Sequence, residues 1–365
     1  MKQSARNRGY KLKKFLLVNE NGSDNIGDHA INEGLKELLT ESDCQFNSEP
    51  FSTTHVHQAP VNTTTTSLSL SQKLRKLLFS FKPFYLLMWL LKHKGRIKQS
   101  CSKDYDGIII GGGQLILSGA SFPPALYAWA RYARKRKIPL YLLGVGCGEH
   151  FYASETWFIK QALKCSEKIY VREYQSVTKL KQLFDVEASF CPDLAFGLQP
   201  LASDNERKNI LVGMTDFAVY TRYCHEVDTP KIANYKDYLH TWYNQVLSMY
   251  QPGMTIVLAS TTLSDAQCNR DLYQLLNNST LKDNIRLIDG VLPLADYRIE
   301  LSRAKTVYSA RMHSLILGKI EGAAIEPWII SKKIENFLGL YTQQNAADLK
   351  LQLREVTKLL GAESE

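Results

Sequence analysis

Short apolar runs of strand length alternate with segments of helical periodicity along most of the chain. Residues 14–18 predict a strand, and the apolar positions between His29 and Leu39 fall on one face of a helix. The same alternation continues through the buried strand Asp106 to Ile110 and the helical segment 122–137, and reaches the strand Thr306 to Ser309. Strands that alternate with helices predict parallel sheets covered by helices on both faces.

The alternation divides into two units, and 365 residues are enough for two hydrophobic cores. We expect an N-terminal Rossmann-like domain over residues 15–200, with an insertion at 49–98, and a C-terminal Rossmann-like domain over 208–330. A cleft would separate them. Residues 331–365 are expected to form C-terminal helices that pack back on the N-terminal domain, and residues 1–14 a basic disordered arm.

The positive charge is concentrated in two segments. The net charge is +9, yet residues 1–14 carry six Lys/Arg and residues 73–98 carry eight, with no acidic residue in either. The rest of the chain therefore sums to about −5 by subtraction. A nucleic-acid enzyme usually spreads its cations over the groove that follows the phosphates, so we do not expect a nucleic-acid partner.

The cysteines and the N-terminus indicate the cellular compartment. Seven scattered cysteines without a C-x-x-C pair argue against a disulfide framework and a zinc site, and favour a reducing cytosol. The apolar run Phe15 to Val18 is too short for a signal peptide. We expect a cytoplasmic protein that binds no metal.

The basic segment 73–98 has two interpretations. Its centre, Phe84 to Leu91, is apolar and is flanked by lysines and arginines, but it is too short to span a bilayer. It fits a segment that lies in an anionic membrane surface, which would make the protein peripheral on the inner face of the cytoplasmic membrane. It fits equally well a buried helix with solvated basic ends.

Polar and glycine-rich loops follow several predicted strands, where parallel sheets bind ligands. Asn25 and Asp28 lie between the first strand and the first helix, where Asp28 could cap the helix and helix amides could attract an anion or sugar hydroxyls. A plain capped turn is the alternative. Gly112, Gly113 and Gln114 follow a buried strand, and Gly146 follows the next one, so backbone is exposed there for close approach.

Three further candidates also follow predicted strands. Arg311 offers a planar fork suited to carboxylate or phosphate, and His313 can transfer a proton near neutral pH. Arg172 is a second candidate anion clamp. An Arg paired with an acid, a His that caps a helix, and an Arg172–Glu173 surface pair are the simpler alternatives.

Taken together and in this order, these loops resemble the polysaccharide pyruvyltransferase family. The resemblance covers residues 15–340 and departs from the family pattern at His29, Cys147 and Glu173. The matching segments are Asn25 to Asp28, Ile109 to Gly113, Gly144 to Gly146, Val171 to Glu173 with Ser176, Pro192 to Phe196, Arg311 to His313, and Trp328 to Phe337.

The resemblance implies a fold, a donor and an acceptor. The fold would be like that of the GT-B glycosyltransferases, with the active site in the cleft between two domains. The donor would be phosphoenolpyruvate, and the acceptor a pair of hydroxyls on a sugar of a bacterial surface or exopolysaccharide glycan, giving a cyclic pyruvate ketal. Arg311 and His313 would contact the donor. No cofactor is implied, and the acceptor could be lipid-linked or free.

The residues support a hypothesis about their roles. His313 is the candidate general acid, and Asp28 the candidate base, with Asp193 a weaker one. The candidate substrate-binding residues are Arg311, Arg172, Asn25, Gly112, Gly113, Gln114 and Gly146. Two alternatives stay open, because fold does not determine function: a GT-B-like glycosyltransferase that uses a nucleotide sugar, and a non-catalytic glycan-binding protein.

Overall fold

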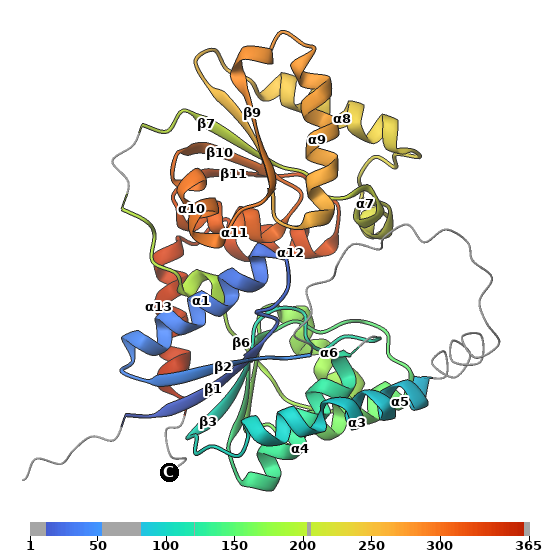
Figure 1. Cartoon of the computed structure of the whole chain (residues 1–365), viewed down its shortest axis with the longest axis vertical. Coiled ribbons are helices and arrows are strands. Elements are labelled where there is room, and N and C mark those ends of the chain that lie inside the picture. The colour runs from blue at the N-terminus through green and yellow to red at the C-terminus, as the bar shows by residue number, and fades with distance from the viewer. Residues whose placement is uncertain (1–11, 53–81, 120, 203–205, 361–365) are drawn as a thin grey trace, which may run out of the picture.

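A computed structural model shows two α/β domains, one above the other in Figure 1, each built on a parallel sheet. The alternation of strands and helices therefore indicated the correct fold class. The residues that the structure describes are 12–52, 82–119, 121–202 and 206–360.

The first sheet has six parallel strands in the order β2-β1-β3-β4-β5-β6. The chain moves to one side of β1 with β2 and to the other side with β3, so the strand order reverses between β1 and β3. Ligands of open α/β sheets bind beyond the strand ends at such a reversal. The strands are β1 (Lys14–Asn19), β2 (Gln45–Pro50), β3 (Gly107–Gly111), β4 (Leu140–Val145), β5 (Lys168–Val171) and β6 (Ser189–Phe190).

Helices cover both faces of this sheet. Along β1, Phe15 and Leu17 pack into one hydrophobic cluster while Leu16 and Val18 pack into another, as the two-residue period of a strand requires. Helix α1 and a short 3-10 helix pack on the first face, and the other four helices of this domain pack on the second. The helices are α1 (Ile26–Glu41), α3 (Lys82–Ser100), α4 (Phe122–Arg136), α5 (Ala153–Leu163) and α6 (Tyr174–Phe184), with a short 3-10 helix, η1 (Leu194–Gly197).

The second sheet has five parallel strands in the order β11-β10-β7-β8-β9, with a reversal between β7 and β10. The strands are β7 (Asn209–Gly213), β8 (Thr255–Ser260), β9 (Ile285–Val291), β10 (Ala304–Ser309) and β11 (Ala324–Pro327). Its helices are α7 (Phe217–Tyr223), η2 (Cys224–Glu226), α8 (Tyr235–Met249), α9 (Leu263–Asn277), η3 (Lys282–Asn284), α10 (Leu294–Ser302) and α11 (Met312–Ile320).

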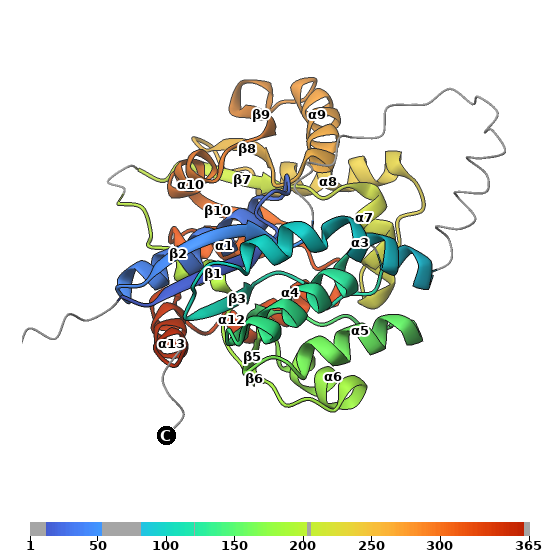
Figure 2. The same ribbon diagram turned by 60° about the horizontal axis from the view of Figure 1, so that its bottom comes forward.

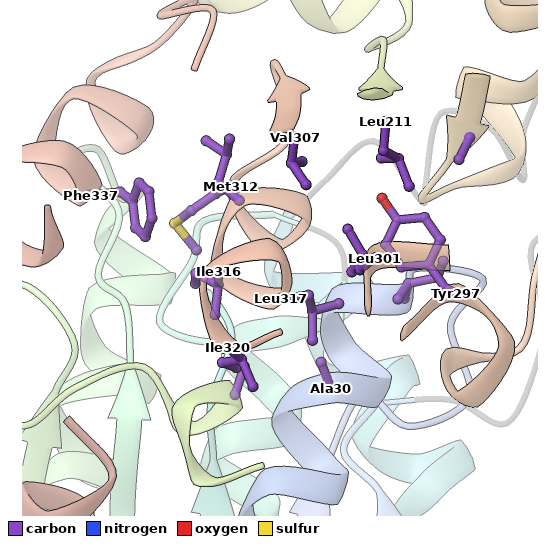
Figure 3. Packing of buried hydrophobic residues seen from close by; sticks show 14 of the residues in the cluster. Ala30, Leu211, Tyr297, Leu301, Val307, Met312, Ile316, Leu317, Ile320 and Phe337 are labelled. Atoms are coloured by element: carbon purple, nitrogen blue, oxygen red, sulfur yellow. The ribbon is translucent and has the colours of Figure 1, made fainter. Parts of the chain in front are cut away.

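One hydrophobic cluster runs without interruption from the first sheet into the second. It includes Ala30 of α1, Tyr297 of α10 and Leu317 of α11, which lie in the same layer in Figure 3. All three side chains are completely buried. Burial of this shared apolar surface stabilises the contact between the domains, and so fixes the two sheet edges relative to each other.

The last two helices lie against the first domain. They are α12 (Lys332–Tyr341) and α13 (Ala346–Lys358), which follow β11. The Tyr341 hydroxyl donates to the carbonyl of Arg172 over 3.1 Å. Arg354 and Lys350 of α13 reach Glu41 at 2.7 and 2.9 Å. The C-terminal segment therefore connects α1 with the end of β5.

The segment expected to be an insertion, 49–98, contains most of helix α3, and strand β2 overlaps it with its last two residues. Strand β2 pairs along its whole length with β1, although its sequence Gln-Phe-Asn-Ser-Glu-Pro lacks the apolar alternation of a strand. It lies at the edge of the sheet, where no residue is fully buried. Helix α3 packs on α4 and on the sheet. No helix in the described ranges is long and apolar enough to cross a bilayer. The basic arm 1–14 lies almost wholly outside those ranges.

Candidate active site

A cavity of about 190 Å³ opens at the strand ends of the first sheet, at the reversal between β1 and β3. Its lining comes from the loops after β1 and β3, the residue after β5, and the starts of α4, α11 and α12. The lining residues are Asn19, Glu20, Asn25, Asp28, Ile31, Gly111, Gly112, Gly113, Gln114, Leu115, Phe122, Arg172, His313 and Lys333. Both domains therefore contribute to one polar site.

The loop after β1 presents Asn25, and the first turn of α1 presents Asp28. Asn25 caps α1, and its side chain accepts a hydrogen bond from the amide of Gly27 over 2.9 Å. The expectation that Asp28 is the cap is therefore wrong, because the helix begins two residues before it. The Asp28 carboxylate accepts one from the Ser23 hydroxyl over 2.6 Å. Gly27 lies against the His313 ring, because an added Cβ would stand 2.1 Å from Nδ1. Only glycine allows the loop and the histidine to approach this closely.

The same loop is tied to the second domain. The amide of Ile26 donates to the carbonyl of Thr261 over 3.0 Å. The amide of Leu263 donates to the carboxylate of Asp24 over 2.9 Å. These bonds hold the capped start of α1 against the loop between β8 and α9, and thus fix the position of Asp28 relative to His313.

A buried charge cluster forms the floor of the cavity. The Arg172 guanidinium pairs with Asp193 at 2.8 Å, and both side chains are at most 4% exposed. Nε2 of His313 lies 3.6 Å from the same carboxylate oxygen, too far for a hydrogen bond. Nε2 is buried and has no hydrogen-bond partner in the described structure. The imidazole is held by packing against Gly27 and by its charge contact with Asp193.

The protonation states in this cluster follow from burial and charge. Burial opposes ionisation of Asp193, but His313 and Arg172 outweigh that effect and hold the pKa of its carboxyl well below the usual range. Asp193 is therefore ionised and bonded, which suits an orienting group better than a base. Burial lowers the pKa of His313, although Asp193 opposes this. The imidazole is neutral near pH 7 until an anion binds beside it.

Lys333, near the start of α12, is a cation that the sequence analysis did not single out. It lines the cavity, and no ion pair or hydrogen bond joins its ammonium to another residue in the parts of the chain that the structure describes. Burial and the neighbouring Arg172 lower its pKa to about 8, with Asp193 opposing. A lysine without a partner beside an arginine creates a positive site for an anionic ligand.

The sequence matches the model of the polysaccharide pyruvyl transferase family over residues 25–320. The chain belongs to the polysaccharide pyruvyl transferase family. The resemblance seen in the strand-end motifs is thereby confirmed, and the protein is a transferase of this family. No curated protein matches the sequence.

Solved structures of low sequence identity share the architecture. A protein from Listeria monocytogenes, described as a UDP-N-acetylglucosamine 2-epimerase, superposes with a TM-score of 0.51 at 11% identity, covering 95% of this chain and 88% of that chain. The Anabaena protein HepE, solved with UDP and glucose, gives a TM-score of 0.49 at 11% identity, covering 95% and 100%. At 11% identity the likeness to the Listeria protein concerns the fold alone, and it confirms the GT-B-like fold expected for the family.

Most of the sequence-predicted site residues of this transferase meet in the cavity. They are Asn25, Asp28, Gly112, Gly113, Gln114, Arg172 and His313. Gly146 stays just outside the lining, against Gln114 and Arg172. The parallel sheet brings the ends of β1, β3, β4 and β5 to one edge, and His313 joins these residues from the second domain.

Arg311 is not brought to the cavity. Its guanidinium pairs with Asp265 and also reaches the Thr262 hydroxyl at 3.4 Å. Asp265 is completely buried and accepts a second bond from the amide of Asp216 over 2.9 Å. The expected donor clamp is therefore, in this structure, the partner of a buried acid. This was the alternative that the local sequence left open.

The glycine loops also differ from the expectation that their backbone is exposed for the close approach of a ligand. The amide of Gly112 donates to the carbonyl of Leu143 over 2.7 Å, and that of Gly146 donates to the carbonyl of Gly113 over 2.8 Å. Gly112 has φ +68°, and an added Cβ would stand 1.9 Å from Ile31. These two glycines allow close packing at the base of the cavity, while their N–H groups complete the sheet edge.

The described residues include no group of three metal-ligating side chains that could hold a metal ion. The Asp-x-Asp pattern at 104–106 resembles a metal-binding motif but lies at the opposite end of the first sheet from the cavity, where Asp106 accepts a bond from the amide of Lys14. The His-x-His pattern at 55–57, another possible metal-binding pattern, lies outside the described residues.

Proposed function

We propose that this family member transfers the pyruvyl group of phosphoenolpyruvate to two hydroxyls of a sugar in a bacterial surface or exopolysaccharide glycan, forming a cyclic ketal. The observation that carries the proposal is the convergence of Arg172, Lys333 and His313 on one cavity of the family fold. Phosphoenolpyruvate carries a carboxylate and a phosphate, and its transfer requires a proton donor. The cavity offers two cations and one imidazole.

In this scheme Lys333 and Arg172 bind the donor. Lys333 takes one anionic group, because its ammonium has no partner in the described structure, while Arg172 uses one nitrogen for Asp193 and presents the rest of its fork. The donor's charge beside His313 favours the protonated imidazole, so donor binding raises the pKa of that ring from its lowered value. Donor binding thereby favours the protonated form of His313, which is the form that can act as a general acid.

The transfer balances with these groups. His313 gives a proton to the methylene carbon of the donor, which becomes the methyl group. The first sugar hydroxyl adds to the adjacent carbon and loses its proton to Asp28, which lines the same cavity. The bond from that carbon to the phosphate oxygen breaks, and the leaving phosphate takes the proton that Asp28 accepted, which returns Asp28 to its ionised form. The second hydroxyl then closes the ketal, and its proton restores His313.

Thermal unfolding with candidate donors tests this assignment. A ligand that binds only the folded protein raises the melting temperature. We expect phosphoenolpyruvate to stabilise the protein, and pyruvate, which lacks the phosphate, to do so much less. Stabilisation by a nucleotide sugar instead would assign a glycosyltransferase-like donor and contradict the proposal. Binding of glycan without any donor would indicate the non-catalytic alternative.

A further inference from the structure

Helix α3 exposes apolar side chains on the outside of the first domain. Leu87, Met88 and Leu91 are 52%, 37% and 49% exposed, while Leu86 and Trp89 on its other face are buried. The three exposed residues are adjacent on one stripe of the helix, since their spacing follows the helical period. A cluster of this kind marks a surface that contacts something apolar.

The charged residues of α3 and of the neighbouring α4 are all basic. The sequences of α3 and α4 contain nine Lys/Arg and no Asp or Glu. Lys92, Lys94 and Lys98 are exposed and follow the apolar residues along α3. Figure 2 shows α3 and α4 packed side by side across one face of the molecule, so the cations of both helices add to one field.

The direction of α3 relates this surface to the cavity. The helix precedes β3 in a parallel sheet, so it runs back against the strands, and Leu87 and Leu91 lie toward the edge at which the strands end. Phe122, the first residue of the adjacent α4, lines the cavity itself. The apolar part of the surface is therefore on the side of the active site.

We propose that α3 lies in the surface of an anionic bilayer, with Leu87, Met88 and Leu91 among the acyl chains near the headgroups. The lysines of α3 and the basic end of α4 would then face anionic lipid headgroups. A nucleic-acid groove would attract the cations but gives no reason for three exposed aliphatic side chains. A helix with an apolar stripe next to lysines is typical of interfacial binding.

Flotation of the full chain with phosphatidylcholine vesicles, with and without phosphatidylglycerol, tests the proposal. We expect binding to the anionic vesicles only, decreasing with salt. The variant Leu87→Gln/Met88→Gln/Leu91→Gln should lose binding, and Lys92→Gln/Lys94→Gln/Lys98→Gln should lower it by about 100-fold. Leu351→Gln/Leu359→Gln on the C-terminal segment and Lys231→Gln/Lys236→Gln/Lys305→Gln in the second domain are matched controls, and should bind like the wild type.

Three results would overturn the proposal. The first is the absence of binding to anionic vesicles by the folded protein. The second is binding that falls equally in the control variants, which would indicate simple charge attraction. The third is a lowered melting temperature of the Leu87, Met88 and Leu91 variant with unchanged vesicle binding, which would mean that protein covers this surface. Vesicle binding does not depend on the donor, so its failure is separable from failure of the proposed transfer.

Discussion

Each domain supplies an arginine directly after a buried strand, and the two arginines have different surroundings. Arg172, at the end of β5, is buried beside the cavity and lines it while it pairs with Asp193. Arg311, at the end of β10, pairs with Asp265 and lies outside the lining. A position at the end of a strand therefore does not by itself place an arginine in the lining of the cavity.

The contribution of the second domain to the cavity is instead His313, two residues after Arg311. It reaches the first domain because Gly27 leaves room for its ring. The comparison divides the site into anion-binding groups, Arg172 and Lys333, and a proton-transfer group carried by the other domain. Loss of each group should therefore change a different measured quantity.

The largest effect is expected for His313→Gln, which keeps the size of the side chain but removes the titrating ring. Turnover should fall by ~10²–10⁴, the usual effect of removing a proton-transfer group. Steady-state kinetics with phosphoenolpyruvate and acceptor measure it, and donor affinity should change far less. Full turnover in this variant would show that His313 is not the acid.

Gly27→Ala should act on the same step by displacing the ring. The added Cβ would stand 2.1 Å from Nδ1 of His313, so one of them must move. Relief of this overlap requires a shift on the order of 1 Å, and misplacement of a catalytic group by about 1 Å costs about 10²-fold in turnover. Gly339→Ala in α12 is the matched control, because its added Cβ meets nothing within 4 Å. Equal turnover of the two variants would contradict the role of this contact.

Arg311→Ala should lower stability more than donor affinity. It leaves the buried carboxylate of Asp265 without its cation, which costs about 1–3 kcal/mol in the free energy of unfolding. Denaturant unfolding measures this cost. The affinity for phosphoenolpyruvate should stay within about twofold. A large loss of affinity in a stably folded variant would restore Arg311 as a donor clamp and remove the contrast with Arg172.

The last effect concerns the pH dependence of donor binding. The pKa of Lys333 is lowered to about 8, so its ammonium is charged below that pH and neutral above it. Donor affinity should therefore be highest below pH 8 and decrease as the pH rises through 8. Lys333→Arg keeps its charge at higher pH and should shift the decrease upward. Titrations of phosphoenolpyruvate against both proteins at several pH values measure this shift. An identical pH profile of donor affinity in the wild type and Lys333→Arg would show that another group causes the decrease.

The sequence predicted the sheets better than the site. The buried strands of both domains are apolar and are followed by glycine or polar loops, so periodicity was enough to find them. Strand β2 is polar because it lies at a sheet edge, and periodicity could not reveal it. The short strand β11 was missed as well, so the loop after it, which leads to Lys333, was not recognised as a strand-end loop.

The charge pairing of the site could not be derived from sequence. Arg311 and Asp265 are 46 residues apart, and Arg172 and Asp193 are 21 apart. A separation along the chain does not show which acid meets which arginine after folding. Lys333 was visible within the family-like segment Trp328 to Phe337, but nothing local distinguishes it from its neighbour Lys332, which is exposed.

Titration of phosphoenolpyruvate against the wild type, Lys333→Met and Lys332→Met at pH 7 tests the central claim most directly. The claim is that this cavity binds the donor through a lysine without a partner in the described structure. Hydrogen bonds to charged groups are worth about 1.5–3 kcal/mol, so Lys333→Met should bind the donor roughly 10- to 150-fold more weakly. Lys332→Met should bind like the wild type. Equal affinity of the three proteins would contradict the assignment of the donor site.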